Sequence, residues 1–327
     1  MIIRWGIVGL GNMANTFASA ISEVQNAKLV CAASKSKTKL EIFAKNFNIK
    51  HSYKFQDYSE LIKSNEIDAV YISTLNNTHV DLILECVKSN KRILCEKPIG
   101  LNANEANIAL ELIKKYQISF YEAIAYRSHP QTDNLLQLIQ NGEIGTIKKI
   151  NSTFGFKIKH IKKDSRLFSK ELGGGAILDV GCYPVSFFNL FKKENESIKL
   201  TKSKGTFSIT GVDDEAEAEF LIGKNILGNC KVSFKKNLRN SCTIYGSKGT
   251  INVPSPWLPP LKSYIEVFND NSYYKNFNSS KKSIYAIQIE HISNLFLKNE
   301  KKNTSQINID ESVEIINILD KWRANIT

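Results

Sequence analysis

Lys97 is the side chain whose type and position first suggest chemistry. Residues 93–95 are apolar and predict a short buried strand, which Glu96, Lys97 and Pro98 end because proline cannot continue a ladder of backbone hydrogen bonds. Open α/β sheets bind ligands in the crevice at the carboxyl ends of their strands, so an ammonium placed there should point at a ligand. We therefore expect the residues before Lys97 to build a cofactor site, and most of those after it to build a substrate site.

A glycine-rich turn at residues 9–14 predicts what the cofactor is. Gly9, Gly11 and Ala14 fit the pattern G-x-G-x-x-G/A, between a strand expected over residues 2–8 and a helix expected over residues 13–22. The first glycine permits a tight turn, the second lets a pyrophosphate approach the backbone, and the small third residue lets the helix pack on the strand. The N-terminus of that helix favours phosphate groups, so the sequence predicts a dinucleotide site.

The strand expected over residues 29–33 leads to Ser34 and Lys35, where an NAD site normally has a carboxylate for the ribose 2′-hydroxyl. A hydroxyl and an ammonium would instead bind the 2′-phosphate of NADP. We therefore favour NADP(H) and keep NAD(H) as the other candidate. The alternative interpretation is that Lys35 and Lys37 form only a solvated cap on the next helix.

Strands and helices alternate up to residue 123, which predicts an α/β fold with a doubly wound parallel sheet of the Rossmann type. Thr74, Asn76 and His79 follow the carboxyl end of a strand and are expected to contact the cofactor, whereas Thr78 is expected to cap the next helix. The other expected elements are strands at 51–53, 69–73 and 119–123 and helices at 38–47, 59–64, 80–89 and 104–116.

After residue 123 strands follow one another without intervening helices, which indicates an α+β domain with a mostly antiparallel open sheet. We place a dinucleotide-binding Rossmann domain at residues 1–122 and a substrate-binding and oligomerisation domain at residues 123–327. The elements expected in the second domain are helices at 132–140 and 311–325 and strands at 147–156, 216–222, 228–234, 242–245 and 249–253.

Composition narrows the class of protein. The 327 residues carry 44 Lys and Arg against 32 Asp and Glu, a net charge of +12, but the lysines are spread along the chain and no nucleic-acid motif is present. We expect a small-molecule substrate, no nucleic acid, and no membrane, because no apolar run approaches the ~20 residues that cross a bilayer. The six cysteines lack paired or metal-like spacing, so we expect reduced thiols, no metal and a cytoplasmic protein.

Several motifs in chain order resemble the glucose–fructose oxidoreductase and inositol dehydrogenase family, closest in look to its dimeric dihydrodiol dehydrogenase and D-xylose dehydrogenase branch. They are the turn at 9–14, Glu-Lys-Pro at 96–98, Tyr-Arg-Ser-His-Pro at 126–130, Gly-Gly-Gly-Ala-Ile-Leu-Asp-Val-Gly-Cys-Tyr-Pro at 173–184 and Tyr-Gly-Ser-Lys-Gly-Thr at 245–250. The dihydrodiol branch carries an aromatic residue where Ala125 stands, and this departure puts an aromatic dihydrodiol substrate in doubt.

Asp179 and Tyr183 are spaced so that on a helix starting near residue 175 they share one face, with roughly 5–6 Å between their Cβ atoms. The resemblance puts this face opposite the nicotinamide and beside Lys97. Oxidation of an alcohol removes a hydride from carbon and a proton from oxygen, and the proton needs a base. We expect Tyr183 to be that base, Lys97 to stabilise the phenolate and the developing alkoxide, and Asp179 to orient the substrate or Lys97. The structural alternative is a helix-capping tyrosine with a Lys–Asp ion pair that ties the domains.

The expected function is the NADP-dependent transfer of a hydride between the nicotinamide and a secondary alcohol or carbonyl of a sugar, sugar derivative or related diol. The alternatives are a catalytically silent sensor that binds the cofactor, and a lyase or hydrolase that uses the nicotinamide transiently. The resemblance also implies a homodimer or homotetramer that assembles through the open C-terminal sheet. The cations within residues 157–166 suggest an anionic substrate, or else only a solvated run of charge.

These expectations assign two sets of site residues, which share Lys97 and Arg127. The residues expected to bind the cofactor are Gly9, Gly11, Asn12, Met13, Ser34, Lys35, Thr74, Asn76, His79, Glu96, Lys97 and Arg127. The residues expected to bind the substrate are Lys97, Arg127, His129, Phe154, Arg166, Asp179 and Tyr183, and the catalytic ones among them are Lys97, Tyr183 and Asp179.

Overall fold

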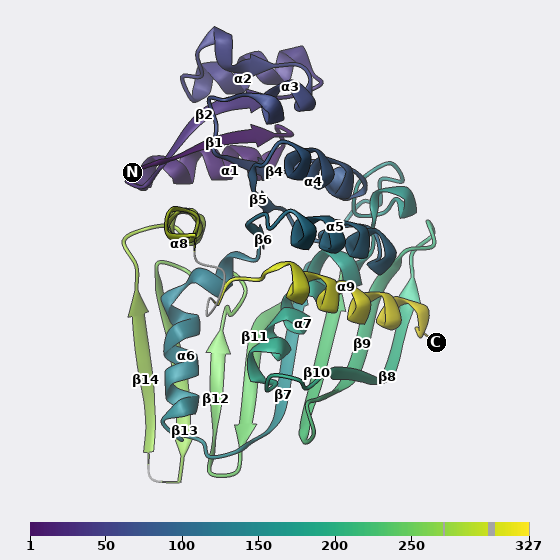
Figure 1. Cartoon of the computed structure of the whole chain (residues 1–327). Coiled ribbons are helices and arrows are strands. Elements are labelled where there is room, and N and C mark those ends of the chain that lie inside the picture. The colour runs from purple at the N-terminus through teal and green to yellow at the C-terminus, as the bar shows by residue number, and fades with distance from the viewer. Residues whose placement is uncertain (271, 300–304, 327) are drawn as a thin grey trace. The chain divides into compact units, whose positions relative to one another are not determined.

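The structure, a computed structural model, describes residues 1–270, 272–299 and 305–326. The chain divides into two compact units, one formed by Met1–Ser128 with Lys282–Val313 and the other by His129–Lys281 with Glu314–Thr327 (Figure 1). The sequence-based division at residue 122 kept the whole C-terminal part together. It did not anticipate the return of a late helix to the first unit, where the helix covers the parallel sheet.

The first unit is built on a six-stranded parallel sheet with the order β3-β2-β1-β4-β5-β6. Its central strands read as nearly continuous apolar runs because helices cover both of their faces. The Rossmann prediction for this part of the chain is confirmed. The strands are β1 (Ile3–Val8), β2 (Ala27–Ala33), β3 (Lys54–Phe55), β4 (Ala69–Ile72), β5 (Arg92–Cys95) and β6 (Phe120–Glu122).

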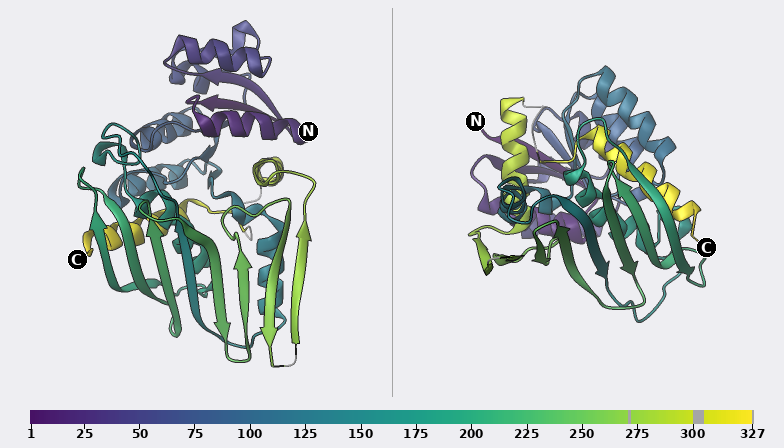
Figure 2. Two further views of the ribbon diagram at one scale, coloured as in Figure 1. Left: turned by 180° about the vertical axis from the view of Figure 1, so that it is seen from behind. Right: turned by 90° about the horizontal axis from the view of Figure 1, so that it is seen from below.

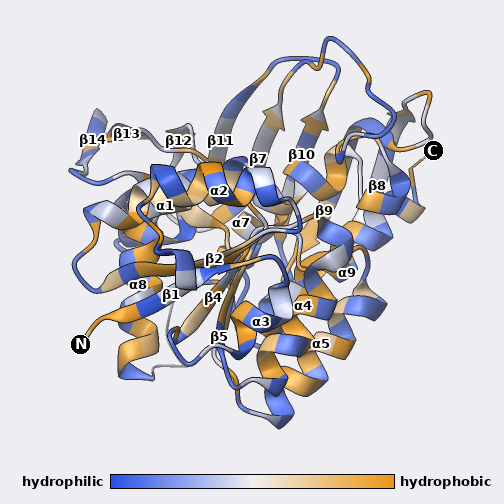
Figure 3. Ribbon diagram, turned by 90° about the horizontal axis from the view of Figure 1, so that it is seen from above, coloured by the Kyte–Doolittle hydropathy of each residue, from blue (hydrophilic) through white to orange (hydrophobic). Residues whose placement is uncertain are grey.

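Helices lie on both faces of this sheet (Figure 3). On one face, α1 (Asn12–Ala20), α2 (Lys37–Asn46) and α8 (Ile284–Lys298) share one apolar core with the strands. Trp5 anchors that core, since its ring packs on Phe296 of α8 with centroids 5.6 Å apart and its Nε1 donates to Ser293 Oγ at 3.1 Å. On the other face α3 (Tyr58–Lys63), α4 (His79–Lys88) and α5 (Ala103–Lys115) pack side by side.

The second unit is built on an eight-stranded sheet with the order β14-β13-β12-β11-β7-β10-β9-β8. All its neighbouring strands are antiparallel except β7 and β10, so the predicted mostly antiparallel α+β architecture is confirmed. The strands are β7 (Ile147–Gly155), β8 (Ile198–Phe207), β9 (Asp213–Ile222), β10 (Ile226–Ser233), β11 (Leu238–Gly246), β12 (Gly249–Pro254), β13 (Lys262–Asn269) and β14 (Ser272–Ser279).

Among the described residues of this unit, helices cover one face of the second sheet and leave the other open (Figure 2). These are α6 (Pro130–Gln140), which packs on β13 and β14, and α7 (Cys182–Phe188), which continues a π-helical segment, Ile177–Gly181, over the central strands. The last helix, α9 (Ile309–Ala324), begins in the first unit, and its Trp322 packs on Phe220 of β9 at 5.8 Å. The alternation of buried and half-buried residues along β9 reflects one covered and one open face.

Some local predictions were wrong, and each error has a physical cause. His51–Tyr53 is a 3₁₀ turn, and the short strand beside β2 is Lys54–Phe55. Thr78 occupies the N-cap position of α4 without capping it, because its hydroxyl donates to Leu75 O at 2.8 Å and contacts Thr74 Oγ1 at 2.7 Å. Strands β8, β13 and β14 were missed because their open-face side chains are polar or aromatic and the apolar alternation is weak.

Candidate functional site

The carboxyl ends of the parallel strands meet in register at one edge of the first sheet. Val8 of β1 pairs with Ala33 of β2 and with Ile72 of β4, and Ile72 pairs with Cys95 of β5. The residues that follow these strand ends are Gly9, Ser34, Ser73 and Glu96, so they lie along the same edge. This edge is where open α/β sheets bind their ligands.

The turn after β1 fits a pyrophosphate. Gly9 has a φ of +87°, and a Cβ there would lie 2.6 Å from Thr74 Cγ2, so only glycine fits. A Cβ on Gly11 would meet nothing within 4 Å, which leaves open space above the backbone. Gly11 is also the N-cap of α1 and has no side chain that could cap the first backbone N–H groups of this helix, among them that of Met13. Those amides would hold the phosphates of a dinucleotide.

The end of β2 fits the adenosine side of such a cofactor. Ser34 is buried, and its Oγ accepts the backbone N–H of Ser36 at 3.2 Å, which leaves the hydroxyl hydrogen able to donate. Lys35 is exposed, with Nζ 5.6 Å from the centre of the Tyr58 ring. Because partial burial raises the pKa of Tyr58, this ring is a neutral neighbour for the ammonium. The contacts of Ser34 and Lys35 with a 2′-phosphate stay a prediction.

The Glu96-Lys97-Pro98 turn is fixed by the neighbouring strand β4. The hydroxyl of Tyr71, on β4, donates to Glu96 Oε1, and the Tyr71 ring stacks on Phe17 of α1 with centroids 4.2 Å apart. Burial raises the pKa of Tyr71 well above its ordinary value, so this phenol stays a donor. The carboxylate of Glu96, which was expected at the cofactor, is thus held by the Tyr71 hydroxyl, and the following Lys97 is half-buried.

His79 lies between two of the ligand-side loops. Its ring is fully buried, with Nδ1 2.8 Å from Pro98 O and Nε2 3.3 Å from Thr74 O. Burial lowers the pKa of this imidazole, which favours the neutral ring. A neutral ring has only one N–H, and the shorter contact indicates that Nδ1 carries it and donates to Pro98 O. The geometry favours a role in positioning the loop of Lys97 and Pro98, and the cofactor contact expected from the sequence stays a prediction.

Arg127 is another residue whose surroundings favour a structural role. Its side chain is buried and forms an ion pair with Glu311, at the start of α9 within the same unit. A buried guanidinium with a carboxylate partner is held firmly, because breaking such a pair leaves an uncompensated charge. The contacts of Arg127 with cofactor and substrate expected from the sequence stay predictions.

In the second unit, Asp179 and Tyr183 lie on the π-helical segment and the first turn of α7. The predicted α-helix from residue 175 is therefore wrong in type over its first turn, although the two residues remain one turn apart. Asp213 fixes the start of this segment, since its Oδ2 accepts the backbone N–H of Ile177 at 2.7 Å. A Cβ on Gly175 would lie 2.3 Å from Asp213 Oδ1, so the turn depends on that glycine.

The ring of Tyr183 is held by two aromatic neighbours. Phe154 of β7 meets it edge to face with centroids 5.3 Å apart, and Trp257 lies 6.4 Å away. Trp257 is itself fixed by its Nε1, which donates to Thr153 O at 3.2 Å. Phe154, expected at the substrate, thus serves at least to orient the tyrosine.

Asp179 has a cationic neighbour within its own unit. Arg166 Nη1 lies 2.8 Å from Asp179 Oδ1, with the arginine side chain half exposed and the aspartate buried. The pair brings together two residues expected at the substrate. The lysines of the cationic loop, Lys157, Lys159, Lys162 and Lys163, are exposed, as in a solvated run of charge.

His129 lies at the N-cap of α6 and is 1% exposed. Its Nδ1 accepts the backbone N–H of Gln131 at 3.1 Å, and burial lowers its pKa to about 4. The imidazole is therefore neutral at physiological pH and has a capping role. Its expected contact with substrate is not shown by this geometry.

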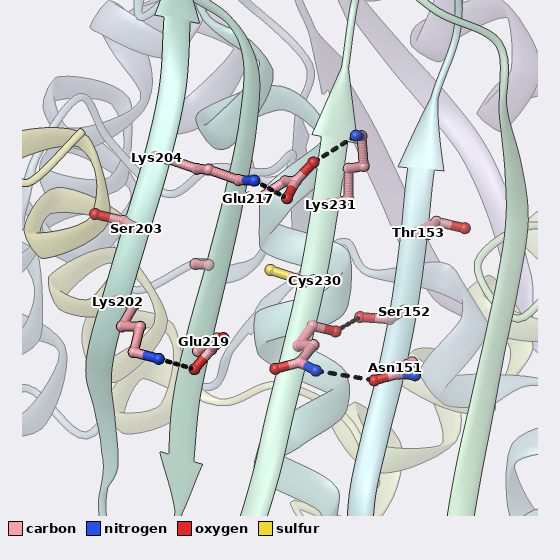
Figure 4. A pocket seen from close by; sticks show the side chains of 12 residues that line it. Asn151, Ser152, Thr153, Lys202, Ser203, Lys204, Glu217, Glu219, Cys230 and Lys231 are labelled. Carbon is pink, nitrogen blue, oxygen red and sulfur yellow. Dashed lines mark hydrogen bonds and ion pairs between the residues drawn. The ribbon is translucent and has the colours of Figure 1, made fainter. Parts of the chain in front are cut away.

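One hollow of the second unit lies on the open face of its sheet, over β7 to β10 (Figure 4). Lys204 and Lys231 both face Glu217 there, and Lys202 lies 3.5 Å from Glu219. The lysines of this hollow are thus neutralised by neighbouring carboxylates. Because none of the residues predicted for catalysis lines it, we do not assign the active site there.

Several features bear on other classes of site. The six cysteines are buried, free thiols. Within the described ranges, no three His, Cys, Asp or Glu side chains gather as metal ligands would. A search of those same residues finds no helix with the length and apolar character that crossing a bilayer requires.

Four residues that fix the candidate site residues or the turns that carry them were not predicted from the sequence: Tyr71, Glu122, Asp213 and Trp257. Tyr71 and Glu122 lie in apolar strands of the first sheet, where an isolated polar side chain is itself a signal because burial demands a partner. Asp213 and Trp257 contact Ile177 and Tyr183, which are distant from them in sequence, so no local sequence pattern predicts these contacts.

Comparison with known proteins gives matches over most of the chain. The family described as "Oxidoreductase family, NAD-binding Rossmann fold" matches residues 3–123, and the GFO/IDH/MocA C-terminal domain matches residues 133–252. The trans-1,2-dihydrobenzene-1,2-diol dehydrogenase of Xenopus tropicalis is 29% identical over 327 residues, covering 98% of this chain and 97% of that protein. The human protein of that name is 26% identical over 332 residues, covering 100% and 97%.

Solved structures share the fold. The aldose–aldose oxidoreductase from Caulobacter crescentus, complexed with glycerol, has a TM-score of 0.90 at 17% identity, covering 99% of this chain and 97% of that one. A 3-ketoreductase from Actinomadura kijaniata, in complex with NADP and TDP-benzene, has a TM-score of 0.88 at 18% identity, covering 100% and 98%. The resemblance drawn from the motifs is confirmed: the chain belongs to the GFO/IDH/MocA family of NAD-binding oxidoreductases.

Proposed function

We propose that this oxidoreductase transfers a hydride between NADP(H) and a secondary alcohol or carbonyl of a sugar, sugar derivative or related diol. The observation that carries the proposal is the register of the parallel strand ends, which brings Gly9, Ser34 and the turn of Lys97 to one edge. Support for the substrate class comes from relatives named as diol dehydrogenases and from a fold neighbour named as an aldose–aldose oxidoreductase.

Bound NADP(H) would accept or supply the hydride at its nicotinamide ring. The chain's own residues would handle the proton and the charge. In the oxidative direction, the phenolate oxygen of Tyr183 takes the proton from the substrate hydroxyl as the hydride leaves the carbon, so Tyr183 ends protonated and the substrate becomes a carbonyl. Lys97 donates a hydrogen bond to the same substrate oxygen and stabilises its developing negative charge. Asp179, steadied by Arg166, orients the substrate hydroxyl.

Preference for NADP over NAD is part of the proposal. Ser34 and Lys35 stand at the end of β2, and residues 34–37 include no carboxylate that would repel a 2′-phosphate. Ser36 caps α2 by accepting the backbone N–H of Lys39 at 3.4 Å, so this helix N-terminus also lies beside the expected phosphate position. The solved 3-ketoreductase with NADP bound shows that the same fold accommodates this cofactor.

Titration and turnover test the proposal together. The purified chain is titrated with NADPH and NADP and then offered a panel of sugars, sugar acids and diols, while the absorbance of the reduced nicotinamide is followed. We expect turnover from the wild type and from the control Lys88→Ala, which changes an exposed lysine on α4. We expect none from Lys97→Ala, with cofactor binding retained. Cofactor binding without turnover on any substrate would favour the silent sensor, and wild-type turnover by Lys97→Ala would remove Lys97 from this role.

We also propose a homodimer or homotetramer that forms through the open face of the second sheet. Phe268, Tyr273 and Phe277 are 37%, 53% and 74% exposed at the β13–β14 end of that face, and the first two stack with centroids 4.6 Å apart. Exposed aromatic groups of this kind are common in interfaces. Light scattering should give a multiple of the 36.9 kDa chain mass, reduced by Phe277→Asp; a monomer mass for the wild type would contradict assembly.

A further inference from the structure

Glu122 is a buried carboxylate directly behind the turn that carries Lys97. It ends β6, is 2% exposed, and pairs along the sheet with Cys95 of β5. Its Oε1 accepts the backbone N–H of Ile99 at 3.1 Å. Because Ile99 comes two residues after Lys97, this bond holds the far side of the Lys97 turn against the sheet.

The groups around this carboxylate compensate its charge only in part. Oε2 accepts no hydrogen bond from the described residues. Ser312, on α9, favours the ionised form of Glu122 but does not form a hydrogen bond with Oε2. Glu311, which pairs with Arg127, and the thiol of Cys95 are the other ionisable neighbours. Burial raises the pKa of Glu122 to about 7, and Lys97 acts in the opposite direction by favouring the carboxylate.

The interaction between Glu122 and Lys97 is necessarily mutual. A cation that favours the ionised form of a carboxylate is itself favoured by that carboxylate, because the two charges share one interaction free energy. The charge of Glu122 therefore helps keep Lys97 protonated. All the groups named here belong to the first unit, so their arrangement is fixed within it.

We propose that Glu122 is a positioning residue for Lys97, which fixes the Lys97 turn through Ile99 and sustains the lysine's positive charge through its own. The catalytic meaning of this inference rests on the proposed function, since it matters for turnover only if Lys97 acts on the substrate oxygen. The positional and electrostatic parts are properties of the protein alone.

Two substitutions separate these parts. Glu122→Gln keeps a carbonyl oxygen that can accept from Ile99 but removes the charge, whereas Glu122→Ala removes both. The matched control is Glu111→Gln, the same chemical change at an exposed position on α5. Thermal melting and NADP binding are measured first, so that a variant that fails to fold is recognised and the Gln variant then carries the test.

The decisive measurement does not need turnover. The rate at which Lys97 reacts with a small acylating reagent is followed against pH by peptide mass spectrometry, which gives the apparent pKa of this lysine. We expect Glu122→Gln to lower that pKa, because the attraction between the two charges is lost. Glu111→Gln should leave it unchanged. An identical Lys97 curve for Glu122→Gln and the wild type would overturn the proposal.

Turnover supplies the second readout. We expect Glu122→Ala to lower kcat by ~10-fold or more while the Kd for NADP changes by less than about 2-fold, because the Lys97 turn is loosened and the phosphate site is untouched. The Gln variant should shift the pH profile of kcat without this loss. If the wild type turns over no substrate, the proposed function fails, yet the Lys97 reactivity curve still decides the inference. Unchanged kcat in the Ala variant of an active enzyme would overturn the positioning role.

Discussion

Asp213 offers the sharpest test of how the second unit holds Asp179 and Tyr183. Its carboxylate is 4% exposed, accepts the N–H of Ile177 at 2.7 Å, and has a pKa raised by burial from 3.8 to about 6. The perturbation is Asp213→Asn, which keeps an oxygen to accept that hydrogen bond and removes the ionisation.

The magnitude follows from the difference between the folded and unfolded pKa values of Asp213. Because the folded value is the higher one, the folded state binds this proton more tightly, and the resulting stability is fully present below pH 3.8 and lost as the pH rises through about 6. A difference of about 2 units corresponds to ~3 kcal/mol, of which ~1.5 kcal/mol falls between about pH 5 and about pH 8. The free energy of unfolding of the wild type should therefore fall relative to Asp213→Asn by that amount over this interval.

Urea unfolding at several pH values measures this difference, with tryptophan fluorescence as the probe because Trp257 and Trp322 lie in the same unit. Asp164→Asn, an exposed carboxylate of that unit, is the control and should follow the wild type throughout. Other carboxylates titrate equally in all three proteins, so only the difference between curves is interpreted. A difference between Asp213→Asn and wild type that stays constant with pH would refute the reasoning.

Three further substitutions test the candidate site. Lys35→Asp should lower the ratio of NADP to NAD affinity by ~10-fold or more, since a carboxylate replaces an ammonium at the 2′-phosphate; an unchanged ratio in fluorescence titration would place that recognition elsewhere. Tyr183→Phe should reduce kcat by ~10²-fold or more with NADP binding intact, and a near-normal kcat would exclude the phenol as the base. Gly9→Ala should abolish NADP binding in calorimetry, because its Cβ would lie 2.6 Å from Thr74 Cγ2; retained affinity would contradict the fit of this turn.

The fold was predictable where one pattern suffices locally. The strands before Gly9, Ser34 and Lys97 are short apolar runs followed by turn residues, so their place in a parallel sheet could be inferred without neighbours. Helix α8 was not predicted, although Ala286, Ile289 and Phe296 all face one apolar core, because the chain around it supplies no alternating strands to place it. Where α8 packs depends on Trp5, which lies at the other end of the chain.

The sequence suggests which residue types form the candidate site, and their roles stay predictions. The types and spacing of Lys97, Asp179 and Tyr183 can be read from the chain, but the residues that pack against them cannot. His79 was expected at the cofactor because of its position after a strand, and that contact stays a prediction, whereas the contacts of its buried ring with Pro98 O and Thr74 O could not be foreseen from local spacing. Arg127 pairs with Glu311, which lies on a helix distant in sequence, so local spacing could not predict this ion pair.

The first unit is built from two separate stretches of the chain, and this affects how it folds during synthesis on the ribosome. Residues 1–128 emerge first, but α8, whose Phe296 and Ser293 contact Trp5, follows only after the intervening second unit has been made. At ~5–20 residues per second, those roughly 150 residues take about 8–30 s to synthesise. During that interval α1 and α2 can cover their part of this face, but the apolar surface around Trp5 that α8 covers stays exposed. A fragment ending at residue 128 is therefore expected to aggregate where the full chain folds.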